Sequence, residues 1–203
     1  MANRLLYLAR HGEYEATHGA DPEDGELTEI GRQQSELLGR RLEGMPFSAV
    51  HHSPLRRAVQ TAQIVAEHLP GVPLLASELL EECIPAVPDR QWLTLSQAEF
   101  FAHLSAQVVA AGPGQAAAAI QAHAGAVTVD RRELVISHGN LINWFVAQAL
   151  EAPDHAWLRT LHYSCALTVI MYSPDRTRLI SYNDIGHLPS SMRGTDYPME
   201  ARI

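Results

Sequence analysis

Residues 5–12 read LLYLARHG, and this stretch decides how the rest of the chain is interpreted. A second stretch, ELVISHG at residues 133–139, has the same design: a hydrophobic run that ends in histidine and glycine. Short apolar runs of this kind predict buried strands, and in an open α/β sheet ligands bind where such strands end. We therefore expect His11 and His138 to meet in one site although they lie far apart in the sequence.

The segment SPLRRAVQTA, residues 53–62, adds cationic side chains to this picture. It follows a short predicted strand, and Ser53 and Pro54 suit the N-cap and the first position of a helix. Arg56 and Arg57 then lie just inside that helix. Arg10 and Arg57 offer planar guanidinium groups whose geometry matches a phosphate, whereas we expect Arg56 to be a solvated helix residue or a contact at the rim. The sequence therefore predicts a phosphate site that contains a histidine.

The composition bounds the class of protein. A chain of 203 residues that is 46% hydrophobic and 19% charged fits one globular domain, residues 1–203. Its net charge of −8 and its scattered arginines disfavour a nucleic-acid partner, which requires a positive stripe. A homodimer is compatible with this composition, which does not decide the oligomeric state.

The N-terminus and the cysteines set expectations about location. The chain enters a strand almost at once, without the pattern of a signal peptide or a membrane span. Cys83 and Cys165 are far apart and lack metal-ligand spacing, so no disulfide framework or zinc site is indicated. We expect a cytoplasmic protein with no membrane partner.

Strand and helix patterns alternate along the chain, which predicts an α/β fold. The final pair of strands is separated only by a turn and reads as an antiparallel hairpin. We predict a three-layer α/β/α sandwich whose mostly parallel sheet carries this hairpin at one edge. The predicted strands are residues 4–9, 47–51, 72–75, 133–137, 167–172 and 178–182, and the main helices are 29–42, 54–68 and 141–150.

Two segments do not follow the alternation. Residues 13–26 are rich in Gly, Asp and Glu and predict an irregular, acidic loop of the kind that borders active sites. Residues 83–129 turn alanine-rich and predict a helical insertion, interrupted at Gly112, Pro113 and Gly114. Substrate specificity is expected to depend on these two segments.

The predicted residues suit phosphoryl transfer. Neutral imidazole is a workable nucleophile, and we assign that role to His11. His138 and the backbone N–H of Gly139 would hydrogen-bond the developing charge at a helix N-terminus, beside Arg10 and Arg57. A carboxyl group near the phosphate would act as general acid and then as base. Glu81 and Glu82 are both placed for it, and the residues alone do not choose between them.

At this point the chain resembles the histidine phosphatase superfamily, whose members are also called phosphoglycerate mutase-like proteins. The family's motifs are similar to RHG at residues 10–12, to LTxxGxxQ at 27–34 and to SPLxRAxQTA at 53–62, whose arginine falls on Arg57. The resemblance implies the phosphoglycerate mutase-like fold, a phosphohistidine on His11 and catalysis without a metal or cofactor. It also assigns the acid to Glu82 and the second histidine to His138.

Within the superfamily, several segments resemble the branch that contains a mitochondrial Ser/Thr protein phosphatase. True mutases have a Gly-x-Trp-Glu-Gly stretch after the acid, whereas Cys83, Ile84 and Pro85 follow Glu82 here. We therefore favour a hydrolase acting on a phosphorylated small molecule or a phosphoprotein. A mutase and a non-catalytic phosphate-binding module are the alternatives. For His187 two readings stay open, support of the site or packing of the C-terminal turn.

Overall fold

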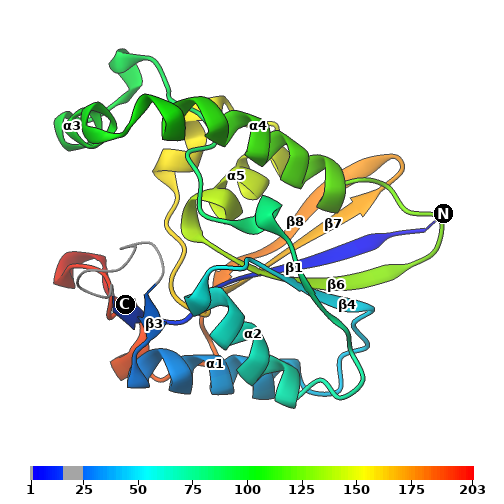
Figure 1. Cartoon of the computed structure of the whole chain (residues 1–203). Helices are drawn as coiled ribbons and strands as arrows, with labels where there is room; N and C mark the ends of the chain where they lie inside the picture. Colours follow the sequence, from blue (N-terminus) through cyan, green and yellow to red (C-terminus); the bar gives the residue numbers. More distant parts are fainter. Residues whose placement is uncertain (1, 16–24) are drawn as a thin grey trace.

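Six strands form one mixed sheet in the order β5-β4-β6-β1-β7-β8 (Figure 1). The computed structural model describes residues 2–15 and 25–203. β5, β4, β6 and β1 run parallel to one another, while β7 is antiparallel to both β1 and β8. The predicted sheet with its edge hairpin is confirmed. The strands are β1 (Arg4–Arg10), β4 (Ala49–His52), β5 (Leu74–Ala76), β6 (Arg131–Ser137), β7 (Leu167–Ser173) and β8 (Arg176–Asp184).

Helices cover both faces of the sheet, which gives the predicted three layers. In Figure 1, α1 and α2 lie below the sheet, and α4 and α5 lie above it. A separate buried apolar cluster fills the space on each face. The helices are α1 (Glu29–Leu42), α2 (Arg56–Glu67), α3 (Leu95–His103), α4 (Ala106–His123) and α5 (Gly139–Ala149), with short 3₁₀ turns η1 (Glu78–Leu80), η2 (Arg90–Trp92), η3 (Asp154–Arg159), η4 (Ser190–Met192) and η5 (Met199–Ala201).

The start of α1 is held tightly against the chain that follows β1. The side chain of Thr28 caps the helix by accepting from the N–H of Gly31 at 3.0 Å. A Cβ at Gly31 would lie 1.9 Å from the carbonyl oxygen of Glu13, and a Cβ at Gly12 would lie 2.5 Å from that of Gly31. Only glycine permits this approach, so the glycines of two separate sequence motifs serve one backbone contact.

Strand register brings the predicted site residues to one edge. Arg10, the last residue of β1, pairs with Ser137, the last of β6. The N–H of His11 then donates to the carbonyl of Ser137 at 3.0 Å, and the N–H of Ser53 donates to that of Ile136 at 3.0 Å. The chain after β1, after β4 and after β6 therefore leaves the sheet at the same place.

Two local predictions near the site differ from the structure. Ser53 is not the N-cap of α2, because Leu55 takes that position without a side-chain cap. The acidic loop contains a small ladder of β2 (Tyr14–Glu15) with β3 (Glu26–Leu27), and its residues 16–24 lie outside the described part of the chain.

The predicted interruption of the alanine-rich helix is wrong. α4 continues through Pro113, although proline removes a hydrogen bond inside a helix. Gly112 packs directly on the backbone of Ile84, where a Cβ would lie 2.1 Å from the carbonyl oxygen. Ala116 and Ala119, fully buried on the same helix, add to this contact with the core. Tertiary packing therefore outweighs the local preference of the sequence.

Candidate active site

Arg57 lies between the two histidines that end β1 and β6. Its Nε donates to Nε2 of His11 at 3.2 Å, and its Nη2 donates to Nδ1 of His138 at 3.2 Å. All three side chains are buried: His11 is 2% exposed, Arg57 3% and His138 0%. Three segments that are distant in sequence thus form one compact cationic cluster at the carboxyl edge of the sheet.

The hydrogen bonds of His11 define its protonation state. Nδ1 lies 2.8 Å from the carbonyl oxygen of Gly12, which can only accept, so Nδ1 carries the proton. Burial, with further contributions from His138, Arg10 and Arg57, lowers the pKa of His11 well below its ordinary value. The ring is therefore neutral near pH 7 and directs the lone pair of Nε2 at Arg57.

Arg10 forms a second, differently partnered cation beside this cluster. Its Nη1 donates to the carbonyl of His162 at 2.9 Å and to the hydroxyl of Tyr197 at 2.8 Å, and it pairs with Oδ2 of Asp196 at 2.9 Å. Burial opposes the charge, but Tyr197, Asp196 and Glu82 outweigh it, so the pKa of Arg10 is raised. Arg10 therefore remains a cation in its buried position.

Glu82 and Gly139 both lie near Arg10. Glu82 follows η1 and is close enough for its negative charge to raise the pKa of Arg10. A Cβ on Gly139 would lie 3.7 Å from Nε of Arg10, which places the first residue of α5 against that guanidinium. By contrast, Arg56 points away to an exposed ion pair with Glu26 at 2.8 Å. The structure thus brings together Arg10, His11, Arg57, Glu82, His138 and Gly139, and leaves Arg56 at the rim.

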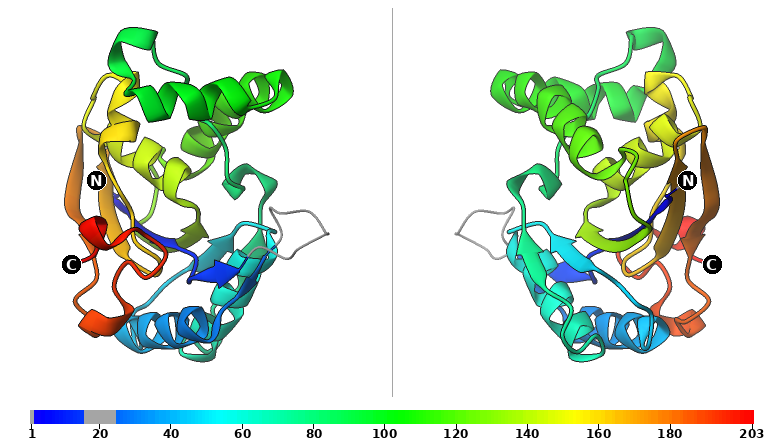
Figure 2. Two further views of the ribbon diagram at one scale, coloured as in Figure 1. Left: turned by 90° about the vertical axis from the view of Figure 1, so that its left-hand side faces the viewer. Right: turned by 90° about the vertical axis from the view of Figure 1, so that its right-hand side faces the viewer.

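Three further residues belong to the site but were not expected from the sequence. The ring of Tyr14 packs edge-on against His11, 5.2 Å between centroids, and lies 4.5 Å from the guanidinium carbon of Arg57. Tyr14 directly follows RHG-Glu, so adjacency could have suggested it. Asp196 and Tyr197 come from the C-terminal segment, which carries no recognisable motif. This segment (red) lies on the side toward which β1 runs in Figure 1, and it faces the viewer in the left view of Figure 2.

An acidic pocket lies beside the site. A pocket of ≈ 490 Å³ opens beside Arg10 and Tyr14. Among the described residues of its wall, Glu13, Glu15 and Asp196 contribute carboxyl groups, and Arg10 is the one arginine or lysine. Its lining is Arg10, Glu13, Tyr14, Glu15, Thr28, Thr195 and Asp196.

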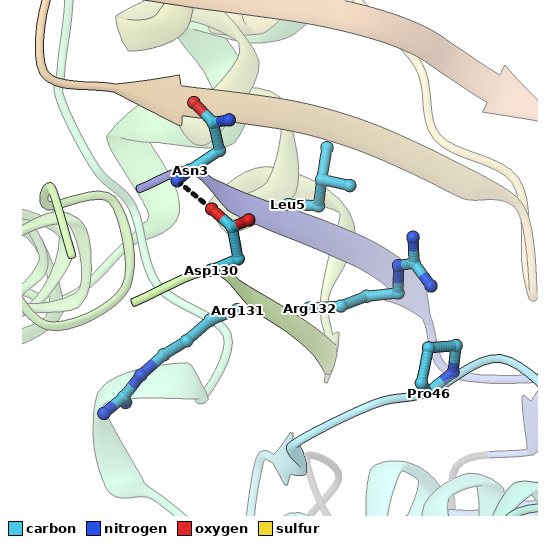
Figure 3. A pocket seen from close by; sticks show the side chains of 6 residues that line it. All are labelled: Asn3, Leu5, Pro46, Asp130, Arg131 and Arg132. Atoms are coloured by element: carbon cyan, nitrogen blue, oxygen red, sulfur yellow. Dashed lines mark hydrogen bonds between the residues drawn. The ribbon is translucent and has the colours of Figure 1, made fainter. Parts of the chain in front are cut away.

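A second hollow, at the opposite end of the strands, does not have comparable chemistry. It has a volume of ≈ 290 Å³ and is lined by Asn3, Leu5, Pro46, Asp130, Arg131 and Arg132 (Figure 3). The side chains of Arg131 and Arg132 point to different sides, as neighbours on a strand do, so they do not form a clamp. Arg131 instead approaches Glu133 at 3.6 Å.

His187 and the cysteines have structural surroundings. Nε2 of His187 lies 3.1 Å from the carbonyl oxygen of Cys165, whose N–H donates to the carbonyl of Arg10 at 3.0 Å. His187 thus supports the end of β1 through one intermediate. Burial raises the pKa of both Cys83 and Cys165 to about 12, so neither thiol ionises near neutral pH. Among residues 2–15 and 25–203, no group of three His, Cys, Asp or Glu is arranged to hold a metal.

Sequence comparison with known proteins finds relatives that are serine/threonine-protein phosphatases by name. The chain is 35% identical over 193 residues to the mitochondrial serine/threonine-protein phosphatase Pgam5 of Caenorhabditis briggsae, covering 92% of this chain and 65% of that protein. It is 32% identical over 194 residues to human PGAM5, covering 93% and 65%. The chain thus spans slightly less than two thirds of the length of these relatives.

These relatives correct one expectation. Their names place them in mitochondria, which contradicts the cytoplasmic location that we expected for this chain. That expectation relied on the sequence near the N-terminus and on the cysteines, and a compact fold carries no location signal of its own. Within the described ranges, none of the helices has the length and apolarity needed to cross a bilayer.

The fold and the family are established by the remaining comparisons. YhfR of Bacillus stearothermophilus has the same fold, with a TM-score of 0.70 at 24% identity, covering 91% of this chain and 98% of that one. The family model of the histidine phosphatase superfamily (branch 1) matches residues 6–185. This match includes at least part of every strand of the sheet and both strand-end histidines, and the chain belongs to the histidine phosphatase superfamily.

Proposed function

We propose that this chain is a phosphomonoester hydrolase that works through a phosphohistidine on His11. The observation that carries the proposal is the position of Arg57, whose guanidinium donates to both His11 and His138 at 3.2 Å. A guanidinium prefers the oxygens of a phosphate to neutral imidazole nitrogens, because charge-assisted bonds are stronger. An incoming phosphoryl group would therefore take over Arg57 and release the lone pair of His11 for attack.

In the first step, Nε2 of His11 attacks phosphorus as the bond from phosphorus to the ester oxygen breaks. Glu82 gives its proton to the departing oxygen, which leaves as an alcohol. Arg10, Arg57, His138 and the N–H of Gly139 hold the three remaining phosphoryl oxygens. The neutral state of His11 supports this role, since burial lowers its pKa and keeps the nucleophile unprotonated.

In the second step, water attacks phosphorus and the P–N bond breaks. Glu82, now a carboxylate, takes a proton from that water, and His11 recovers its lone pair while inorganic phosphate leaves. Each residue ends the cycle as it began, and none of these steps calls for a metal. The hydrogen bond from Nδ1 of His11 to the Gly12 carbonyl keeps Nε2 aimed at the phosphoryl group throughout.

The substrate class that we propose is a phosphoprotein or a phosphorylated small molecule. The first alternative is supported by the names of the PGAM5 relatives, which are serine/threonine-protein phosphatases. The acidic pocket, with Glu13, Glu15 and Asp196, favours leaving groups that carry no negative charge beside the phosphate.

The proposal is tested by trapping the intermediate. The purified chain is mixed with a ³²P-labelled phosphomonoester and quenched in alkali, where phosphohistidine survives. Loss of the label in acid then distinguishes phosphohistidine from a phosphoester, which is stable in acid. We expect label on His11 by peptide mapping. His11→Ala should lose the label and leave less than about 1% of the turnover, since removal of a nucleophile costs several orders of magnitude.

The exposed His103, whose Nδ1 lies 2.6 Å from the carbonyl oxygen of Glu99 one turn earlier in its own helix, provides the matched control. His103→Ala should label and turn over like the wild type. Label on another residue, or full activity of His11→Ala, would show that the nucleophile is assigned wrongly.

A further inference from the structure

Ser53 touches the second histidine at the side facing away from Arg57. Its Oγ lies 2.9 Å from Nε2 of His138, and it accepts the N–H of Leu55 at 3.2 Å. Both Ser53 and His138 are fully buried. The backbone of Ser53 is fixed as well, because its N–H donates to the carbonyl of Ile136 at 3.0 Å. The serine that the sequence presented as a helix cap is therefore a rigid partner of the imidazole.

The hydrogen bonds of His138 assign its tautomer. Arg57 has only donors, so Nδ1 of His138 must accept the bond at 3.2 Å. The neutral ring then carries its proton on Nε2, which donates to Oγ of Ser53. This is the opposite of what the phosphoryl-bound state needs, because a phosphate oxygen facing Nδ1 is itself an acceptor.

We propose that Ser53 is a positioning residue that lets His138 exchange its two neutral tautomers, so that Nδ1 accepts from Arg57 in the free site and donates to phosphate in the occupied site. This inference rests on the proposed function and extends it to a residue that does not touch the substrate. In the exchange, the Nε2 proton passes to solvent water and Nδ1 takes one proton from water. The ring keeps the same number of protons and need not rotate.

A hydroxyl is the group that permits this exchange. Oγ of Ser53 has one hydrogen and two lone pairs, and Leu55 uses one lone pair. The other lone pair can accept from Nε2–H, or the hydroxyl can turn and donate to a bare Nε2, in the same position. A carboxylate would only accept at this place and would hold the first tautomer. Alanine would leave a buried nitrogen without its hydrogen-bond partner.

The other route to a donating Nδ1 is an imidazolium, and the surroundings of His138 oppose it. Burial, followed by the charges of Arg57 and Arg10, lowers the pKa of His138 well below its ordinary value. A doubly protonated ring would lie between two guanidinium groups. The neutral exchange avoids adding that third positive charge.

The decisive measurement is the ¹⁵N spectrum of the imidazole of His138, which distinguishes protonated from unprotonated nitrogens without any turnover. In the free protein near pH 7 we expect Nε2 protonated and Nδ1 bare. With saturating inorganic phosphate, or with orthovanadate, we expect Nδ1 protonated and Nε2 bare. A ring that is unchanged on binding, or that carries protons on both nitrogens, would overturn the proposal.

Two variants connect the tautomer to catalysis. Ser53→Ala should lower kcat by about 10- to 100-fold, as loss of the orienting partner does for metal-bound histidines, and His138 should no longer exchange tautomers on phosphate binding. Ser53→Thr keeps the hydroxyl and should restore both. If the extra methyl of threonine prevents folding, the wild-type spectra alone decide. A Ser53→Ala protein with wild-type kcat and wild-type exchange would refute the role.

Ser35 provides the matched control for loss of a buried serine hydroxyl. It is as buried as Ser53, and its Oγ donates to the Gly31 carbonyl at 2.7 Å. Ser35→Ala should cost comparable stability and leave the His138 tautomers as in the wild type. Failure of the proposed function is distinguishable, because it would show as absence of phosphohistidine in the wild type. Failure of the present proposal would show as labelled His11 with a static His138.

Discussion

Oδ2 of Asp196 lies 2.9 Å from Nη1 of Arg10. A carboxylate from the C-terminal segment therefore forms an ion pair with one of the cations of the proposed phosphate site. Ser164 also donates to this carboxylate, at 3.1 Å. The two partners are 13% and 16% exposed, so the pair is shielded from most solvent screening. A bound phosphate must share Arg10 with this internal anion.

Replacing Asp196 should therefore strengthen the binding of inorganic phosphate. Asp196→Asn keeps the shape of the side chain and removes its charge. The positive charge of Arg10 is then no longer neutralised by Asp196 and attracts a bound phosphate more strongly. A gain of about 1 kcal/mol, typical of one ion pair, lowers the inhibition constant of phosphate by about fivefold. Competition against a nitrophenyl phosphate substrate measures this constant.

Asp175→Asn makes the same change of charge at the exposed β7–β8 turn, where Asp175 is paired at 3.8 Å with Arg176. It should leave the inhibition constant unchanged. A constant that rises in Asp196→Asn would mean that Asp196 holds Arg10 in its binding geometry and does not compete with phosphate.

Glu82→Gln should affect poor leaving groups most. An alkyl phosphate needs a proton on its departing oxygen, whereas nitrophenolate leaves without one, so we expect kcat to fall by about 10²- to 10⁴-fold for the alkyl ester and far less for the aryl ester. Glu81→Gln is the matched control one residue earlier. Equal losses for both esters, or a larger loss in the Glu81 variant, would remove Glu82 from the general-acid role.

Acid should destabilise the fold below about pH 6.5 through buried neutral histidines. Burial is the main cause that lowers the pKa of His123 to about 4 and that of His162 to about 3. As the pH falls below about 6.5, the pKa of histidine in the unfolded chain, these histidines become protonated in the unfolded chain but stay neutral in the native protein. Each group then removes roughly 1 kcal/mol of stability per pH unit, down to its folded pKa.

Urea unfolding at pH 7, 6 and 5 measures this slope. His123→Gln should reduce the dependence of the free energy of unfolding on pH by the contribution of one histidine. His103→Gln, at an exposed site, should leave this dependence unchanged. A slope that is identical in wild type and His123→Gln would contradict the assignment.

The contact between Gly31 and Glu13 predicts a large effect of a single methyl group. Gly31→Ala places a Cβ 1.9 Å from a backbone oxygen, which the chain must relieve by moving the residues that follow His11. We expect a loss of about 1–3 kcal/mol in the free energy of unfolding, together with reduced activity.

Gly114→Ala tests the same substitution where nothing lies within 4 Å of the new Cβ. Because it also lies inside α4, alanine should stabilise the protein by about 0.5–1 kcal/mol. Urea denaturation compares the two variants. Similar stabilities for both would show that the backbone at Gly31 adapts freely.

Local sequence patterns were sufficient for the strands and their layers. LLYLARHG and ELVISHG are short, apolar and β-rich, so they predict buried parallel strands, and helix α1 begins and ends where Thr28 and its stripe of leucines indicate. They were not sufficient where packing opposes propensity. Pro113 stays inside a helix because Gly112 fits against Ile84, a contact that no local pattern reveals.

The sequence by itself determined which residues stand at strand ends, and therefore that Arg10, His11 and His138 share one edge of the sheet. The reason is that strand order and register follow from hydrophobic pattern and short connections. Only the tertiary structure decided the partners: Arg57 between two imidazoles, Ser53 behind His138, and Asp196 on Arg10. Whether a hydrogen bond or ion pair forms between segments distant in sequence depends on differences of a few tenths of an ångström in the distance between two atoms. No periodicity in the sequence encodes those distances.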